Sequence, residues 1–130
     1  MVVCVNGIFV IETKNFDGEI TCNGDSWTQY KYSWKRDEAI EIKSPSKQVK
    51  RNAVKLKEFL LANTQPKTRE KIRKMFIEGI VVITNQRCNI TINEPTVNVV
   101  GLGQLKQFIL NKNPTISLTK DEIEEITKCL

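Results

Sequence analysis

Two charged residues that follow an apolar run, Glu12 and Lys14, are the residues of this sequence best suited to chemistry. Side chains alternate along a strand, so both would point to one face together with Ile8 and Val10. A glutamate in this position can bind a hard divalent cation such as Mg²⁺, while the nearby lysine orients or activates an attacking water. Such a pair suits the hydrolysis of a phosphodiester. The plainer interpretation is a surface ion pair, which stabilises a protein only weakly.

The absence of histidine limits the remaining chemistry to carboxylates, lysines and metal ions. It excludes histidine-based triads, histidine-rich zinc sites and a histidine general base within the chain. The four cysteines form no Cys-x-x-Cys pair and lie in or beside apolar segments, so we interpret them as buried free thiols in a reducing compartment, with disulfides as the alternative. They are Cys4, Cys22, Cys88 and Cys129.

The length and hydropathy of the chain predict one soluble domain over residues 1–130. The 130 residues, of which 40% are hydrophobic, suffice for a single compact core. No stretch approaches the roughly 18 consecutive apolar residues of a membrane span, and no signal-peptide pattern opens the sequence. We therefore expect a cytoplasmic protein without a membrane partner.

The pair Asn6-Gly7 predicts a tight antiparallel hairpin between two apolar strands. Asn-Gly readily takes the two positive φ values of a type I′ turn. A two-residue loop there would set Val5 opposite Ile8 and Met1 opposite Glu12. Both parities of the second strand are apolar, so we expect it to be covered on both faces.

The rest of the pattern predicts a mixed α/β sheet flanked by helices. Gly-containing turns lead through an antiparallel meander whose aromatic residues we interpret as sheet packing, with base stacking as the alternative. These aromatics are Trp27, Tyr30, Tyr32 and Trp34. The further elements expected are strands at 19–22, 27–34, 80–83 and 97–100 and helices that begin at Pro45, at Pro66, after Gly101 and at Thr119.

Two of the predicted helices have clear apolar stripes. The first, introduced by Ser44-Pro45, would bury its stripe at four positions spaced by three or four residues: Val49, Ala53, Leu56 and Leu60. The second would bury Ile72, Met75 and Phe76. At the last helix, Thr119 and Glu122 have the form of a capping box.

Positive charge is concentrated on these first two helices. Residues 43–74 carry eleven Lys or Arg and two acids, a net +9, whereas the rest of the chain carries −4. Around Gln48 stand four basic residues that a DNA or RNA backbone would attract: Lys47, Lys50, Arg51 and Lys55. The alternative is an ordinary solvated helix face.

Taken in order, these features resemble the nuclease-related domain family, whose fold is similar to the PD-(D/E)XK, restriction-endonuclease-like fold. The resemblance rests on residues 6–15, NGIFVIETKN, then Gly18, Trp27, Ser44-Pro45 and Gln48, and the two later apolar strands. It implies that Glu12 is the acidic, metal-binding position, Lys14 the motif lysine, and Gln48 a residue near the site that touches phosphate. Family members usually have Asn where this chain has Ser44.

The resemblance also implies a second metal ligand, an Asp, on the strand that pairs with the Glu12 strand. In the predicted register its position would be the second residue upstream of Met1, and the family's preceding helix has no counterpart either. We therefore expect an N-terminally truncated core, either a piece of a longer protein or a natural short form. The acids that could replace the Asp are Asp17, Glu19 and Asp25.

The expected function is a nuclease-related domain that engages DNA or RNA. In its complete form it would hydrolyse phosphodiesters with Mg²⁺, and in this chain that activity would be weak or absent, because one Glu alone holds Mg²⁺ poorly. The alternative is a catalytically silent nucleic-acid-binding or protein-interaction module with the same fold. An unpaired strand at the shortened edge would favour a homo-oligomer.

Overall fold

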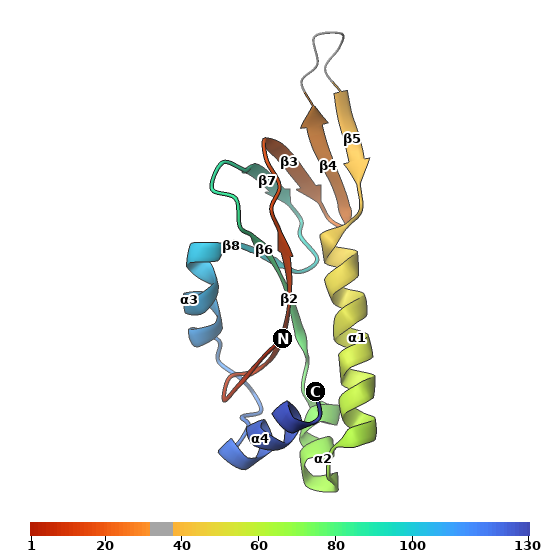
Figure 1. Ribbon diagram of the computed structural model, residues 1–130, viewed down its shortest axis with the longest axis vertical. Helices are drawn as coiled ribbons and strands as arrows, with labels where there is room; N and C mark the ends of the chain where they lie inside the picture. Colours follow the sequence, from red (N-terminus) through yellow and green to blue (C-terminus); the bar gives the residue numbers. More distant parts are fainter. Residues whose placement is uncertain (32–37) are drawn as a thin grey trace.

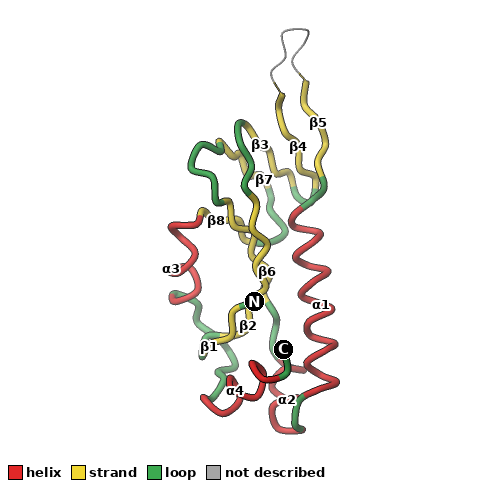
Figure 2. The backbone as a smooth tube through the Cα atoms, viewed as in Figure 1, coloured by secondary structure: helices red, strands yellow, loops and turns green. Residues whose placement is uncertain are grey.

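The computed structural model describes residues 1–31 and 38–130, which form two four-stranded mixed β-sheets with helices packed around them (Figures 1 and 2). One sheet has the order β1-β2-β6-β8 and consists of β1 (Val2–Cys4), β2 (Gly7–Lys14), β6 (Glu78–Ile83) and β8 (Asn98–Gly101). The other has the order β5-β4-β3-β7 and consists of β3 (Glu19–Asn23), β4 (Ser26–Lys31), β5 (Glu38–Ile42) and β7 (Asn89–Asn93). The predicted α/β class with a mixed sheet is confirmed.

Four α-helices and one 3₁₀ turn belong to the described residues. They are α1 (Pro45–Asn63), α2 (Pro66–Lys74), the 3₁₀ turn η1 (Leu102–Gln104), α3 (Leu105–Leu110) and α4 (Lys120–Lys128). In Figure 1, α1 and α3 stand on opposite sides of the first sheet. None of these helices is both long and apolar enough to cross a bilayer.

The N-terminal hairpin is present, but its predicted register is wrong. Val3 lies opposite Ile8 and Cys4 opposite Gly7, so the loop consists of Val5 and Asn6. The predicted pairing of Val5 with Ile8, and with it that of Met1 with Glu12, is therefore wrong by two residues.

The turn chemistry explains this difference. Gly7, with a φ of 136°, takes the conformation that favours glycine, whereas Asn6 is not among the positive-φ residues of the described chain. The Asn6 side chain instead donates from Nδ2 to the carbonyl oxygens of Ile109 and Leu110, at 3.0 and 3.3 Å. A long-range contact with α3 thus replaces the type I′ turn.

Strand β2 is covered on both faces, as predicted. On one face Ile8, 1% exposed, packs with Ala53 and Leu60 of α1. On the other, Phe9, 2% exposed, packs with Ile109 of α3. In the sheet, β2 lies between β1, which runs antiparallel to it, and β6, which runs parallel to it.

Helix α1 begins as the sequence predicts. The Ser44 Oγ accepts a hydrogen bond from the Lys47 backbone N at 3.2 Å, and Pro45 occupies the first helical turn. The predicted apolar stripe faces the core, with Val49 and Leu60 fully buried. The capping box at Thr119 is also confirmed.

The burial predicted for Phe76 is wrong. Helix α2 ends at Lys74, Met75 turns to an extended conformation, and the Phe76 side chain is 82% exposed in the link to β6. Ile72 and Met75 are buried, as predicted.

The second sheet confirms the predicted meander in β3 and β4, although Tyr32 and Trp34 lie outside the described residues. Strand β5, which pairs antiparallel with β4, was not predicted. Trp27 is fully buried and packs the sheet, which agrees with the packing interpretation. Strand β7 was not predicted; it pairs parallel with β3. All four cysteines are free, but Cys22 alone is buried and the others are half-buried.

Candidate functional site

A cavity of about 220 Å³ brings Glu12 of β2 together with the start of helix α1. Its lining consists of Glu12, Lys43, Gln48, Arg51 and Asn52. Three of the predicted site residues, Glu12, Gln48 and Arg51, therefore meet there from segments far apart in the sequence. Helix geometry explains the meeting, because Val49 and Ala53 point into the core and leave Gln48 and Asn52 on the adjoining flank of α1.

Glu12 and Lys14 lie on one face of β2 and form an ion pair, with the Lys14 Nζ 3.2 Å from the Glu12 Oε1. Their side chains are 24% and 27% exposed, so the pair stands where the strand emerges towards solvent. Lys14 contacts Glu12 from outside the cavity, since the cavity lining contains Glu12 but not Lys14. The predicted same-face placement is thus confirmed.

The side-chain oxygen of Gln48 has no partner in the described fold. Its Oε1 is buried, yet it accepts no hydrogen bond from a described residue. A buried acceptor without a partner costs about 1–3 kcal/mol, so such atoms call for a physical explanation. Because Gln48 lines the same cavity as Glu12, a rotation of its side chain would bring this oxygen to a ligand in that cavity.

The donor set fits a weakly held hard cation rather than a complete metal cage. Glu12 and Gln48 offer oxygen atoms, the ligand type that Mg²⁺ prefers. Within residues 1–31 and 38–130, no group of three or more His, Cys, Asp or Glu side chains could hold a metal ion. Water and substrate phosphates, which commonly complete Mg²⁺ sites, would have to supply the remaining ligands.

The four basic residues predicted to contact nucleic acid do not all lie on the same flank of α1. Lys47, Arg51 and Lys55 are exposed. Lys50 lies on the other flank of α1, where its Nζ donates to the Asp25 Oδ2 at 2.7 Å. This hydrogen bond, followed by one from Thr96, lowers the pKa of the Asp25 carboxyl. Asp25, considered as a replacement ligand, is thus held outside the Glu12 cavity.

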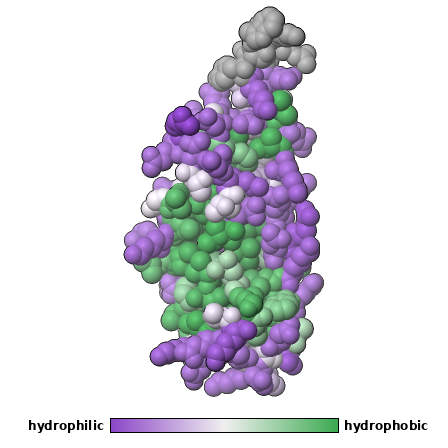
Figure 3. Space-filling view, in the orientation of Figure 1, coloured by the Kyte–Doolittle hydropathy of each residue, from purple (hydrophilic) through white to green (hydrophobic). Residues whose placement is uncertain are grey.

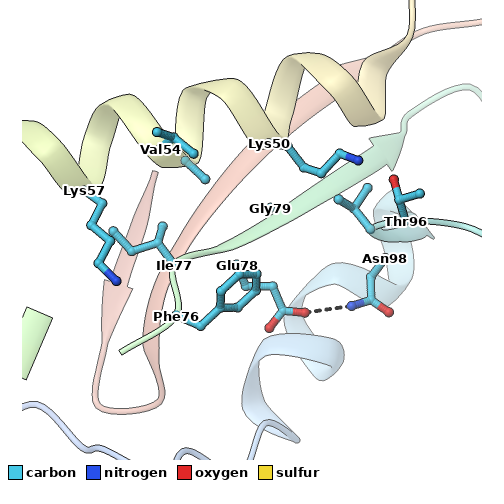
Figure 4. A pocket seen from close by; sticks show the side chains of 11 residues that line it. Lys50, Val54, Lys57, Phe76, Ile77, Glu78, Gly79, Thr96 and Asn98 are labelled. Atoms are coloured by element: carbon cyan, nitrogen blue, oxygen red, sulfur yellow. Dashed lines mark hydrogen bonds between the residues drawn. The ribbon is translucent and has the colours of Figure 1, made fainter. Parts of the chain in front are cut away.

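A second cavity of about 320 Å³ lies on that other flank and is mostly apolar. Figure 4 shows Lys50, Val54 and Lys57 of α1 along one side of it, facing Phe76 and Ile77. Helix α1 therefore separates this apolar cavity from the polar one at Glu12. In the space-filling view, the upper part of the α1 edge is hydrophilic, while the centre of the visible face is hydrophobic (Figure 3).

Sequence reasoning missed two residues of the Glu12 cavity, Lys43 and Asn52. Asn52 could have been found, because it lies four positions after Gln48 and so on the same side of the helix. Lys43 stands just before the helix cap at Ser44, and its place depends on how β5 leads into α1. No periodic signal reports that geometry.

Comparison with known protein families identifies the part of the chain that carries the Glu12 cavity. The family model described as the nuclease-related domain matches residues 1–84. The matched segment runs from β1 through β6 and includes every residue of the Glu12 cavity. Searches of curated proteins and of solved structures found no match.

Proposed function

The chain belongs to the nuclease-related domain family, and on this premise we propose that it binds nucleic acid along the exposed side of α1, next to a vestigial or incomplete hydrolytic site at Glu12. The observation that carries the proposal is the shared cavity of Glu12, Gln48 and Arg51. It joins an acid, an unpaired amide oxygen and a cation at one place.

The basic residues of α1 supply the attraction for the nucleic-acid backbone. Lys47, Arg51 and Lys55 are exposed and lack acidic partners among the ion pairs of the described residues. Exposed cations bind phosphates largely without regard to sequence. Arg51 also lines the cavity, so its guanidinium would hold a phosphate at the cavity mouth.

The residues around the proposed phosphate position are the basis for proposing hydrolysis with Mg²⁺. When bound, the ion would stabilise the charge that develops on the phosphate. Glu12 would hold it, and the Gln48 Oε1 would lie beside it as a second oxygen. Lys14, 3.2 Å from Glu12, would orient the attacking water. One carboxylate gives a weak site, so we propose that hydrolysis by this chain is slow or absent and that a second acidic ligand would raise it.

A second candidate, a catalytically silent binding module, is favoured by the ion pair itself. Lys14 already neutralises Glu12, and the described residues contain no cluster of three metal-ligating side chains. In that case Glu12 and Lys14 are structural and the basic side of α1 carries the whole function.

Cleavage and metal binding distinguish the two candidates. Labelled DNA and RNA strands would be incubated with Mg²⁺ and the wild-type chain, Glu12→Ala, or Glu58→Ala, an exposed acid on α1 that serves as the control. Slow Mg²⁺-dependent cleavage that only Glu12→Ala abolishes supports the hydrolytic proposal. Binding without cleavage by any of the three is expected both for an absent activity and for the silent module, so the metal readout described next then decides between them. Absence of binding contradicts both.

A second readout does not depend on activity. Mn²⁺, a paramagnetic substitute for Mg²⁺, should broaden the side-chain amide NMR signals of Gln48 in the wild-type chain and in Glu58→Ala, but not in Glu12→Ala. Equal broadening in all three would show that Glu12 does not hold the metal.

A further inference from the structure

A larger concavity of about 580 Å³ lies at the carboxyl ends of β6 and β8. The link after β6, strand β7 and the turn η1 complete its walls. It contains none of the residues of the Glu12 cavity, and its lining has no charged side chain among the described residues. Its chemistry is thus distinct from that of the basic α1 surface.

The lining combines amide groups with an aliphatic floor. The amides are Asn85, Gln86 and Gln104, and the aliphatic side chains include Ile90, Val99 and Leu102. Leu102 is 58% exposed, so part of this floor is open to solvent.

The fold leaves amide donors of the cavity available to a ligand. The Asn85 Oδ1 accepts from the Arg87 backbone N at 2.9 Å, and the Gln104 Oε1 accepts from the Gly101 backbone N at 3.1 Å. These bonds orient the two amides through their oxygens and leave their NH₂ groups without a hydrogen-bond partner among the described residues. Gln86 is exposed and makes no side-chain hydrogen bond with a described residue, so it offers both a donor and an acceptor.

An uncharged cavity of this kind suits a flat, uncharged ring that carries donors and acceptors on its edge. Amide side chains pair with the edges of nucleobases, best with the donor and acceptor of adenine. Base faces stack on aromatic side chains and also pack against apolar ones in base-binding pockets. A phosphate or a charged peptide would find no counter-charge here.

The cavity is also placed to receive such a ring from a strand bound at Glu12. Lys14 and Ile83 are register partners in adjacent parallel strands, and the Thr84 backbone N donates to the Lys14 carbonyl at 3.0 Å. Both Ile83 and Thr84 line the cavity. Because β2, β6 and β8 are parallel, their carboxyl ends share one edge of the sheet, where α/β proteins commonly bind ligands (Figure 1).

We propose that the cavity between β7, β8 and η1 binds one nucleobase of the nucleic-acid strand whose phosphates contact α1. This inference rests on the proposed function and adds a base-binding subsite to it. The aliphatic floor packs against the face of the ring, while Gln86 pairs with its edge.

A strand without bases tests the proposal directly. Affinities would be measured for a short oligoadenylate and for a strand of equal length and charge in which every base is removed. The wild-type chain should prefer the adenylate by about tenfold or more. Gln86→Ala and Leu102→Ala should each reduce that preference and leave the affinity for the abasic strand unchanged. Gln107→Ala, which removes an exposed amide on α3 outside the cavity, should keep the preference for the adenylate.

The contrary outcomes are distinct from a failure of the proposed function. Equal affinity of the wild-type chain for both strands, or an unchanged preference in both cavity variants, overturns the base-binding subsite. If neither strand binds, the proposed function fails, and adenosine would then be titrated into ¹⁵N-labelled protein. Chemical-shift changes centred on Gln86 and Gly103 would support the subsite, and their absence at millimolar adenosine would overturn it.

Discussion

Glu12 and Gln48 line one cavity, although one side chain comes from the middle strand β2 and the other from the start of helix α1. Their proximity depends on how closely α1 approaches the first sheet. At the point of contact, Gly79 of β6 faces Val49 of α1, and Val10 of β2 is the register partner of Gly79. The lack of a side chain at Gly79 therefore sets the distance between the helix and the strands that carry the site.

Replacement of Gly79 by alanine should destabilise the fold. A Cβ there would lie 3.0 and 3.1 Å from the two methyl carbons of Val49, which is fully buried. Overpacking of this kind costs about 1–3 kcal/mol of unfolding free energy. Urea denaturation followed by circular dichroism measures it. Gly103→Ala, where the added Cβ meets nothing within 4 Å, is the control and should change stability by less than about 0.5 kcal/mol. Equal stability of the two variants would contradict this account.

Gln48→Leu should separate binding from stability. The Gln48 Oε1 is buried without a described partner, so its removal should leave the free energy of unfolding unchanged or raise it by up to about 1 kcal/mol. The same change should weaken nucleic-acid binding, because it removes the amide from the cavity. Denaturation and a binding titration on one preparation provide both numbers. A loss of stability well above 1 kcal/mol would show that the amide is a structural group.

Glu122→Gln should reduce the acid sensitivity of the protein. Burial, the largest influence, raises the pKa of Glu122, but hydrogen bonds from Lys71 and Thr119 outweigh it, and the pKa lies below its ordinary 4.5. Glu122 thus contributes stability in full above the ordinary value, and this contribution disappears as the pH falls through the lowered folded-state pKa.

The variant should therefore lose about 1–3 kcal/mol at neutral pH, since the Lys71 Nζ no longer meets a charged acceptor at 2.6 Å. It should also lose less stability than the wild-type chain between neutral pH and pH values below 4.5. Denaturation curves across this range measure both effects. Glu124→Gln, an exposed acid on the same helix, should behave like the wild-type chain. Parallel pH profiles of the Glu122 variant and the wild type would refute the assignment.

Local patterns were sufficient to predict much of the fold. The cap at Ser44 and the stripe through Val49 placed α1 correctly, and alternation placed Glu12 and Lys14 on one face. These features depend on residues within a few positions of one another, where helix and strand periodicity apply directly. The placement of Gln48 near Glu12 followed from the family resemblance and not from these local patterns.

The errors arose where distant contacts decide the structure. The side chain of Asn6 bonds to α3 and not to its own turn, which shifted the hairpin register. Lys50 binds Asp25 from another part of the chain, and β7 forms by pairing with β3. None of these partners is visible in a local pattern. The single domain, the cytoplasmic location and self-association stay predictions.

The most direct test of the central claim compares two sets of charge changes. Lys47→Gln, Arg51→Gln and Lys55→Gln would be combined in one variant, and Lys106→Gln, Lys120→Gln and Lys128→Gln, on exposed positions of α3 and α4, in a control with the same net charge. Affinity for a single-stranded oligonucleotide would be measured against salt concentration.

We predict that the α1 variant loses more than tenfold in affinity and that its salt slope falls by about 2, as expected for three lost phosphate contacts at about 0.7 each. The control should keep nearly the wild-type slope. Equal losses in the two variants would show that attraction depends on total charge alone, and would contradict a nucleic-acid surface on α1 beside Glu12.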